Sequence, residues 1–160
     1  MSRAFEGTLP PITLECGVAL EHLHIRGWVA GPDEASFPSA PEREVVVARS
    51  AKAQRAMAPL PKVKCRAPCV LLIHALTGSA EADSWWGPLI GPGRALDTDH
   101  VNVLCFNQLG GCSGTFGPAD EGFPRLADVP GRRAAPDVKG LPARDESVLP
   151  APVTTWDQAR

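Results

Sequence analysis

The apolar positions of this chain fall into a few short runs, and long stretches rich in proline and glycine separate them. Within residues 13–30 and just before them, apolar and polar residues alternate around Ile12 and Leu14 and again around Leu23 and Ile25. Alternation with a period of two is typical of strands that bury one face. The segment therefore predicts two strands, followed by a turn where glycine, proline and aspartate stand together at residues 31–33.

Two continuous apolar runs, residues 70–73 and 101–106, predict a different kind of strand. Runs without polar alternation are typical of strands that are buried on both faces in a parallel sheet. Between them, residues 84–96 hold aromatic and aliphatic side chains interrupted by prolines and glycines, so we expect a broken helical crossover. A strand, a helical crossover and a second strand predict an α/β fold.

Two stretches carry few signals of regular structure. Residues 31–68 hold six prolines, and the only element that we expect within them is a short helix at residues 42–57 with a thin apolar face. Residues 42–66 carry two acids against seven bases, unlike the acidic segments on either side. We therefore interpret residues 31–68 as an atypical, solvated insertion. Residues 117–152 hold seven prolines and predict a long surface loop, which makes residues 119–150 a loop-rich part of the domain.

Composition and charge argue against nucleic-acid-binding, membrane-spanning and secreted proteins. The 160 residues correspond to one domain of ordinary size, and a net charge of −2 provides no field that would attract nucleic acid or anionic lipid. No apolar run approaches the roughly 20 residues that cross a bilayer, and residues 1–10 lack the pattern of a secretory signal. The five cysteines are an odd number without framework spacing. We expect a cytoplasmic protein that binds neither nucleic acid nor membrane.

The turn after the first apolar run is a candidate binding element. Residues 74–78 lie beyond the carboxyl end of a predicted strand, where open α/β sheets bind their ligands. Backbone N–H groups at this place can stabilise a developing oxyanion, as the corresponding loop does in α/β-hydrolases. The alternative is an ordinary turn with His74 hydrogen-bonded in the core, and this stretch alone favours that alternative.

The turn after the second run is rich in glycine, which permits positive φ and close approach of backbone: Gly110, Gly111 and Gly114. The spacing Gly110-x-Cys112-x-Gly114 also matches a nucleophile elbow, with Cys112 as the thiol and His74 as a possible base. An elbow needs a helix directly after its nucleophile, however, and a glycine and a proline follow at residues 117–118. A structural turn is therefore the favoured interpretation.

A metal site is not expected. Cys65 and Cys69 have a spacing typical of ligands, but no second pair of cysteines or histidines stands nearby to complete the four ligands of a structural zinc. His22 and His24 alternate on a predicted strand without a carboxylate cluster beside them. We predict no metal and no bound cofactor.

Several motifs closely resemble the homoserine O-acetyltransferase family: residues 14–17, 72–79, 85–98, 107–114 and 117–118. The string Trp-Trp-Gly-Pro-Leu-Ile-Gly-Pro-Gly-Arg-Ala-Leu-Asp-Thr at residues 85–98 is long and specific. Thr155 and Gln158 fit a capping box, and residues 153–160 look like the start of the helix that precedes the family's elbow. Residues 31–68 and 119–149 do not fit the family.

The resemblance implies the N-terminal half of an α/β-hydrolase-type sheet, incomplete in this chain. It implies transfer of an acetyl group from acetyl-CoA to L-homoserine in methionine biosynthesis, by a ping-pong mechanism, in a family whose members are typically homodimers. It assigns Leu76 to the oxyanion hole through its backbone N–H. It also assigns four residues to the lining of the pocket: Thr77, Asn107, Gly110 and Gly111.

The chain departs from the family in the groups that perform the chemistry. The family's catalytic serine, acid and histidine follow in that chain order, and no Gly-x-Ser-x-Gly occurs in the 160 residues. The catalytic residues therefore have no counterparts here, and we expect an inactive fragment of a truncated gene product. Two alternatives stay open: a relative that uses succinyl-CoA or acylates serine, and a non-enzymatic remnant or interaction module.

Overall fold

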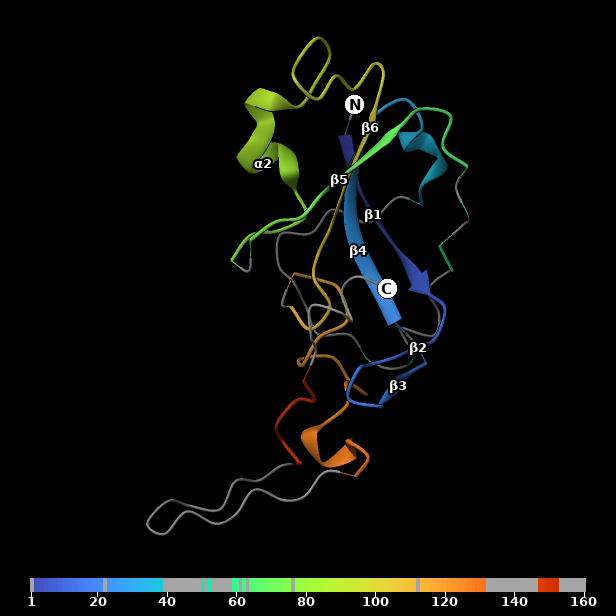
Figure 1. The fold of residues 1–160 in the computed structure, drawn as a ribbon, viewed down its shortest axis with the longest axis vertical. Helices are drawn as coiled ribbons and strands as arrows, with labels where there is room; N and C mark the ends of the chain where they lie inside the picture. Colours follow the sequence, from blue (N-terminus) through green and yellow to red (C-terminus); the bar gives the residue numbers. More distant parts are fainter. Residues whose placement is uncertain are drawn as a thin grey trace.

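The computed structural model describes residues 2–21, 23–38, 50, 52, 59–60, 62, 64–75, 77–111, 113–131 and 147–152. These residues form a four-stranded sheet with the strand order β1-β4-β6-β5 (Figure 1). Its strands are β1 (Ser2–Leu9), β4 (Leu23–Ala30), β6 (Asn102–Phe106) and β5 (Cys69–Leu72). A smaller sheet of β2 (Ile12–Thr13) and β3 (Ala19–Leu20) lies below the main sheet in this view.

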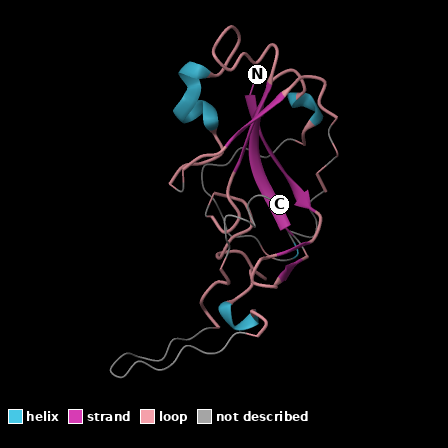
Figure 2. Cartoon of the chain, in the orientation of Figure 1, coloured by secondary structure: helices cyan, strands magenta, loops and turns pink. Residues whose placement is uncertain are grey.

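The pairing of the strands establishes the fold class. Strand β4 is antiparallel to both β1 and β6, whereas β5 is parallel to β6. Adjacent parallel strands need a crossover, and here it contains α2 (Ala82–Trp86) and the 3-10 turn η2 (Gly87–Leu89), which lie to one side of the sheet (Figure 2). The predicted broken helix and the α/β fold are therefore confirmed. Two further 3-10 turns are η1 (Glu34–Ser36) and η3 (Leu126–Asp128).

The core lies on both faces of the sheet because side chains alternate along each strand. On one face, residues of β4, β5 and β6 pack against α2: Trp28, Leu72, Val103, Cys105 and Ala82. On the other face, residues of β1 and β4 pack against the segments around β2 and β3 and the loop after β6: Phe5, Ile25, Val29, Leu14, Leu20, Leu109 and Phe116. All eight residues of β4 are buried, so this strand is the centre of the fold.

Strand β5 is less buried than its apolar sequence predicts. Leu72 faces α2 and is 8% exposed, whereas Leu71 is 57% exposed and Ile73 is 80% exposed. The strand lies at the end of the strand order, and among the described residues only its α2 face is covered. The prediction of a strand buried on both faces is therefore wrong for residues 70–73, although the strand itself and its parallel pairing are confirmed.

Strand β1 was not predicted from the sequence. Phe5 and Gly7 face the core, but a glycine gives only a weak apolar signal, and pairing along the full length of β4 supplies the order. Parts of the stretch predicted as a surface loop are also buried. Phe123 is 3% exposed and Ala151 is 4% exposed, and the Ala151 N–H donates to Pro124 O at 2.9 Å. The surface-loop prediction is wrong for these residues because apolar side chains anchor them.

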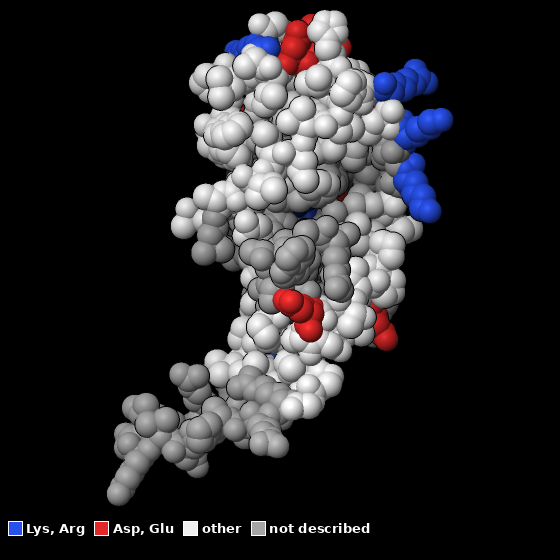
Figure 3. Space-filling view, in the orientation of Figure 1, with Lys and Arg blue, Asp and Glu red and all other residues white. Residues whose placement is uncertain are grey.

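Two predicted helices fall outside the part of the chain that the structure describes. They are the helix at residues 42–57, of which only Ser50 and Lys52 are described, and the helix expected to begin at Thr155. Among the described residues, no helix has the length and apolarity that crossing a membrane requires. Figure 3 shows that much of one face of the molecule carries no charged side chain, and that several basic side chains stand along one of its edges.

Buried Asn102 joins three segments at the start of β6. Its Nδ2 donates to Asp33 Oδ2 at 2.8 Å, and its Oδ1 accepts the Asp33 N–H at 3.0 Å. The same carboxylate oxygen accepts the N–H groups of Arg66 at 2.7 Å and Ala67 at 3.1 Å. The Asn102 amide, with these backbone donors, holds the pKa of Asp33 below its ordinary value. One carboxylate therefore ties the turn after β4 to the entries of β5 and β6.

We expect D33N to flatten the pH dependence of stability in acid. Because the folded-state pKa is depressed, the ionised carboxylate stabilises the fold above its unfolded pKa of about 3.9, and this contribution is lost as pH falls through the folded value. Asparagine keeps an acceptor oxygen but does not ionise. The melting temperature of both proteins is measured from about pH 7 to about pH 2. The difference in melting temperature between the unmodified protein and D33N should shrink below about pH 4. A difference that stays constant would contradict a stabilising role for the ionised Asp33 carboxylate.

Gly27 provides a test of packing at the centre of the sheet. A Cβ at this position would lie 2.5 Å from Phe5 Cζ and 2.9 Å from Cys105 O, and Phe5 is fully buried. We expect G27A to cost about 1–3 kcal/mol in urea unfolding, because neither neighbour can withdraw. Gly87 is the matched control, since a Cβ there meets nothing within 4 Å and its φ is −46°. Equal losses in G27A and G87A would contradict this account.

Candidate functional site

The loops that leave β5 and β6 meet at one edge of the sheet. The two strands are parallel, so their carboxyl ends lie together, at the place where open α/β sheets bind ligands. The loop after β5 is residues 73–80, and it contains the candidate oxyanion element. The loop after β6 is residues 107–117, and it contains the glycine-rich turn. We define these two segments as the first loop and the second loop.

Two amide side chains of the second loop hold the first loop in place. Asn107 is 6% exposed; its Oδ1 accepts the Ala80 N–H at 2.7 Å, and its Nδ2 donates to Ser113 O at 2.5 Å. Gln108 Nε2 donates to His74 O at 3.2 Å. The first loop is therefore tied near its beginning and at its end. Asn107, which the sequence suggested as a lining residue, has the position of a bridge between the loops.

The glycine-rich turn is closed by its own backbone. Gly110 and Gly114 have φ of 77° and 94°, a region that favours glycine. The Gly110 N–H donates to Phe116 O at 2.9 Å, and the Gly111 N–H donates to Gln108 O at 3.1 Å. Both N–H groups are therefore already hydrogen-bonded within the loop. Any contribution of Gly110 and Gly111 to a pocket comes from the backbone conformation that they allow and not from their N–H groups.

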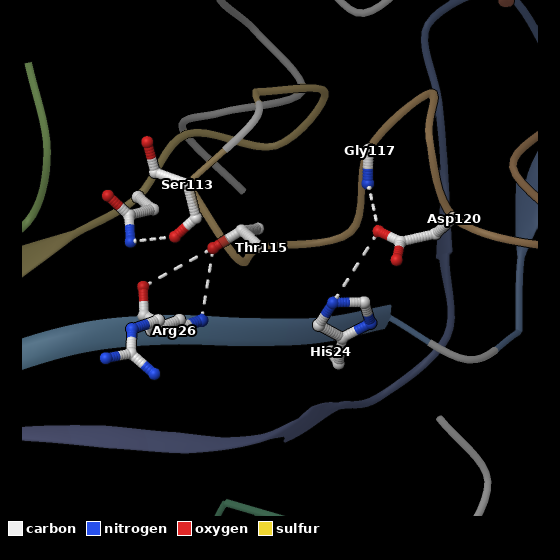
Figure 4. Close-up of polar contacts among 7 residues, drawn as sticks. His24, Arg26, Ser113, Thr115, Gly117 and Asp120 are labelled. Atoms are coloured by element: carbon white, nitrogen blue, oxygen red, sulfur yellow. Dashed lines mark hydrogen bonds and ion pairs between the residues drawn. The ribbon is translucent and has the colours of Figure 1, made fainter. Parts of the chain in front are cut away.

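The second loop is anchored to the central strand β4 (Figure 4). Thr115 Oγ1 accepts the Arg26 N–H at 3.1 Å and donates to Arg26 O at 3.3 Å. The Phe116 N–H donates to His24 O at 3.0 Å, and the Asn107 N–H donates to Arg26 O at 2.9 Å. Because β4 is buried throughout, it gives the loop a rigid support.

A buried histidine–aspartate contact lies beneath the second loop. His24 Nε2 is 3.7 Å from Asp120 Oδ2, which also accepts the Gly117 N–H at 3.0 Å (Figure 4). The side chains are 1% and 9% exposed, and the His24 ring packs edge-on against Phe116. We therefore assign the contact a structural role. The sequence analysis missed it because 96 positions separate the partners and no local pattern links them.

The structure describes some of the remaining candidate residues and not others. Leu76 and Cys112 lie outside the described residues, and so does His22. Thr77 is exposed. His74 is 6% exposed and its Nδ1 lies 2.7 Å from Ala75 O, as the ordinary-turn alternative predicts. Burial raises the pKa of the Cys105 thiol, which keeps this cysteine neutral.

The described residues contain no group of three or more histidine, cysteine, aspartate or glutamate side chains that could hold a metal ion. Cys65 and Cys69 are free thiols at the entry to β5. Cys69 is exposed and Cys65 is partly exposed. Within the part of the chain that the structure describes, Cys65 and Cys69 therefore lack the further ligands that a structural zinc site needs.

The string at residues 85–98 shapes the crossover. Arg94 Nη1 donates to Ile90 O at 3.1 Å and also to Gly87 O. Asp97 Oδ1 accepts the N–H groups of Gly93 and Asp99, both at 3.1 Å, and these bonds lower the pKa of its carboxyl. Arg94 and Asp97 thus bind backbone groups within the string or directly beside it.

Comparison with curated proteins finds partial similarity in sequence to known enzymes. The homoserine O-acetyltransferase of Schizosaccharomyces pombe is 56% identical over 50 residues, which are 31% of this chain and 10% of that protein. The corresponding protein of Corynebacterium diphtheriae is 58% identical over 50 residues, 31% of this chain and 14% of that protein. In Chloroherpeton thalassium the identity is 43% over 76 residues, 48% of this chain and 19% of that protein.

The chain is similar in sequence to homoserine O-acetyltransferases. The resemblance inferred from the motifs is confirmed over these partial stretches, and the chain spans only 10% to 19% of the length of these three relatives. No family model matches the chain. Among solved structures, the homoserine O-acetyltransferase from Staphylococcus aureus aligns with a TM-score of 0.46 and 17% identity, over 74% of this chain and 28% of that one. The enzyme from Bacillus anthracis aligns with a TM-score of 0.42 and 21% identity, over 68% of this chain and 24% of that one.

We expect N107L to loosen the site and the fold together. Leucine removes both amide hydrogen bonds and leaves the Ala80 N–H and Ser113 O without this partner, a loss of about 1–3 kcal/mol in the free energy of unfolding. H100Q is the control, because the His100 side chain is 80% exposed and its replacement should change stability by less than about 0.5 kcal/mol. Urea unfolding measures both, and a neutral N107L would show that the bridge is not needed.

Proposed function

We propose that this chain carries the oxyanion-binding part of a homoserine O-acetyltransferase, a cytoplasmic enzyme of methionine biosynthesis. The substrates are acetyl-CoA and L-homoserine. The supporting observation is the identity of 54% to 58% that 50 to 52 residues of this chain share with three homoserine O-acetyltransferases. The arrangement of the two loops at the carboxyl ends of parallel strands is compatible with this role.

In this proposal the first loop acts on the acetyl group. A serine hydroxyl attacks the thioester carbonyl, and the carbonyl oxygen becomes an oxyanion that the backbone N–H of Leu76 stabilises. Asn107 and Gln108 keep the first loop in register through Ala80 and His74. The attacking serine and its aspartate and histidine have no assigned counterparts in this sequence, which contains no Gly-x-Ser-x-Gly.

A segment exchange tests the proposed role. Residues 69–118 of this chain replace the matching stretch of the Corynebacterium diphtheriae homoserine O-acetyltransferase, and O-acetylhomoserine is measured by mass spectrometry. We expect the chimera to remain active. L76P in the chimera removes the N–H and should reduce kcat by about 10²–10³-fold, whereas L76A keeps the N–H and should retain most of the activity. Equal activity of L76P and L76A would contradict the role of Leu76.

The chain alone is tested separately. Incubated with acetyl-CoA and L-homoserine, the 160-residue protein should release no O-acetylhomoserine and should carry no covalent acetyl group. Mass spectrometry of both the small molecules and the intact protein provides the measurement. An acetyl adduct on this polypeptide would show that it has its own nucleophile and would overturn the proposed inactivity, while leaving the outcome of the chimera unaffected.

A further inference from the structure

Two cysteines at the entry to β5 form a pair that the proposed acetyl transfer does not use. Cys65 and Cys69 are four positions apart, both are free thiols, and the Cys65 thiol lies close enough to Cys69 for the two side chains to interact. Cys69 is exposed and Cys65 is partly exposed, so small molecules in solution reach the pair. The remaining described cysteines are Cys16, which is partly exposed, and Cys105, which is buried.

Hydrogen bonds to Asp33 hold the segment between the two cysteines in place. The N–H groups of Arg66 and Ala67 both donate to Asp33 Oδ2, at 2.7 and 3.1 Å. Cys69 Sγ lies 3.9 Å from Asn102 Nδ2 and 3.8 Å from Ala67 O. The Asp33–Asn102 contact therefore fixes the backbone between the two cysteines and the position of Cys69 Sγ. In an unfolded chain, the same two cysteines would sample many separations.

The environment gives the two thiols different roles. The interaction with Cys69, followed by burial and the nearby Asp33 carboxylate, raises the pKa of Cys65 to about 11. Cys65 therefore keeps its proton, and the more exposed Cys69 is the sulfur that meets an oxidant first. The Asn102 amide directs a donor toward Cys69 Sγ, which helps to hold this sulfur in place.

We propose that Cys65 and Cys69 form a reversible intramolecular disulfide by exchange with a small-molecule disulfide such as oxidised glutathione. The Cys69 thiolate attacks one sulfur of the glutathione disulfide, whose S–S bond breaks and releases a glutathione thiolate. Cys65 transfers its proton to that thiolate and attacks the Cys69 sulfur of the mixed disulfide, and the second glutathione leaves. The protein loses two electrons and two protons, and the glutathione disulfide gains them.

Tryptic mapping of the full chain provides the test. Trypsin cuts after Lys64 and Arg66, so it releases the dipeptide Cys65-Arg66 unless a disulfide links it to the peptide that contains Cys69. The protein is equilibrated in glutathione buffers of increasing oxidised fraction, its free thiols are blocked with iodoacetamide, and it is digested without reduction. We expect the linked peptide to appear as the oxidised fraction of glutathione rises. The number of free thiols should fall by two from the five of the reduced chain.

Three variants and a denatured sample complete the design. C16S should form the linked peptide as the unmodified chain does, and C69S should not form it. C65S should accumulate the mixed disulfide of Cys69 with glutathione, because the second step is blocked. In concentrated urea the linked fraction should fall at the same glutathione ratio. The proposal is overturned if Cys69 is found only as a mixed disulfide in the unmodified chain, or if urea leaves the linked fraction unchanged.

Discussion

The hydrogen bonds between the Asn102 amide and the Asp33 carboxylate are the constraint on which much of this structure depends. Asn102 is fully buried and Asp33 nearly so, and a buried polar group destabilises a fold unless its partners are supplied. Here one carboxylate oxygen accepts three donors, from Asn102, Arg66 and Ala67. The contact fixes where β5 and β6 begin, and with them the parallel pair on which the candidate site is built.

Strand β6 has a buried asparagine at each end, and the two perform related tasks. Asn102 stands at its first residue and fixes the entries to the strands, and Asn107 stands just after its last residue and joins the two loops. The amide is suited to this because it donates and accepts at once without carrying charge. The arrangement links the geometry of the site to the packing of the sheet, since the same short strand supports both ends.

The sequence predicted the parts of this fold that depend on local pattern. The apolar runs located β5 and β6, and the prolines and glycines after Trp86 explained the short α2. It did not predict the exposure of Leu71 and Ile73, because which strand lies at an edge depends on pairing between distant segments. For the same reason, the sequence did not predict the hydrogen bond between Asn107 and Ala80 or the contact of His24 with Asp120. For the site, the motifs indicated the two loops and a resemblance to homoserine O-acetyltransferases. They did not indicate that the N–H groups of Gly110 and Gly111 form hydrogen bonds within the turn.

Hydrogen bonds from its own side chains shape much of the crossover at residues 85–98. Arg94 binds the carbonyl oxygens of Gly87 and Ile90, and Asp97 binds the N–H groups of Gly93 and Asp99, so the loop's shape is encoded within the loop. Its apolar side chains add a second constraint, because Ile90 is buried in the core and Trp85 and Leu96 pack against that core. A substitution in this crossover therefore acts on two things at once, the geometry of the local turns and the cover over one face of the sheet.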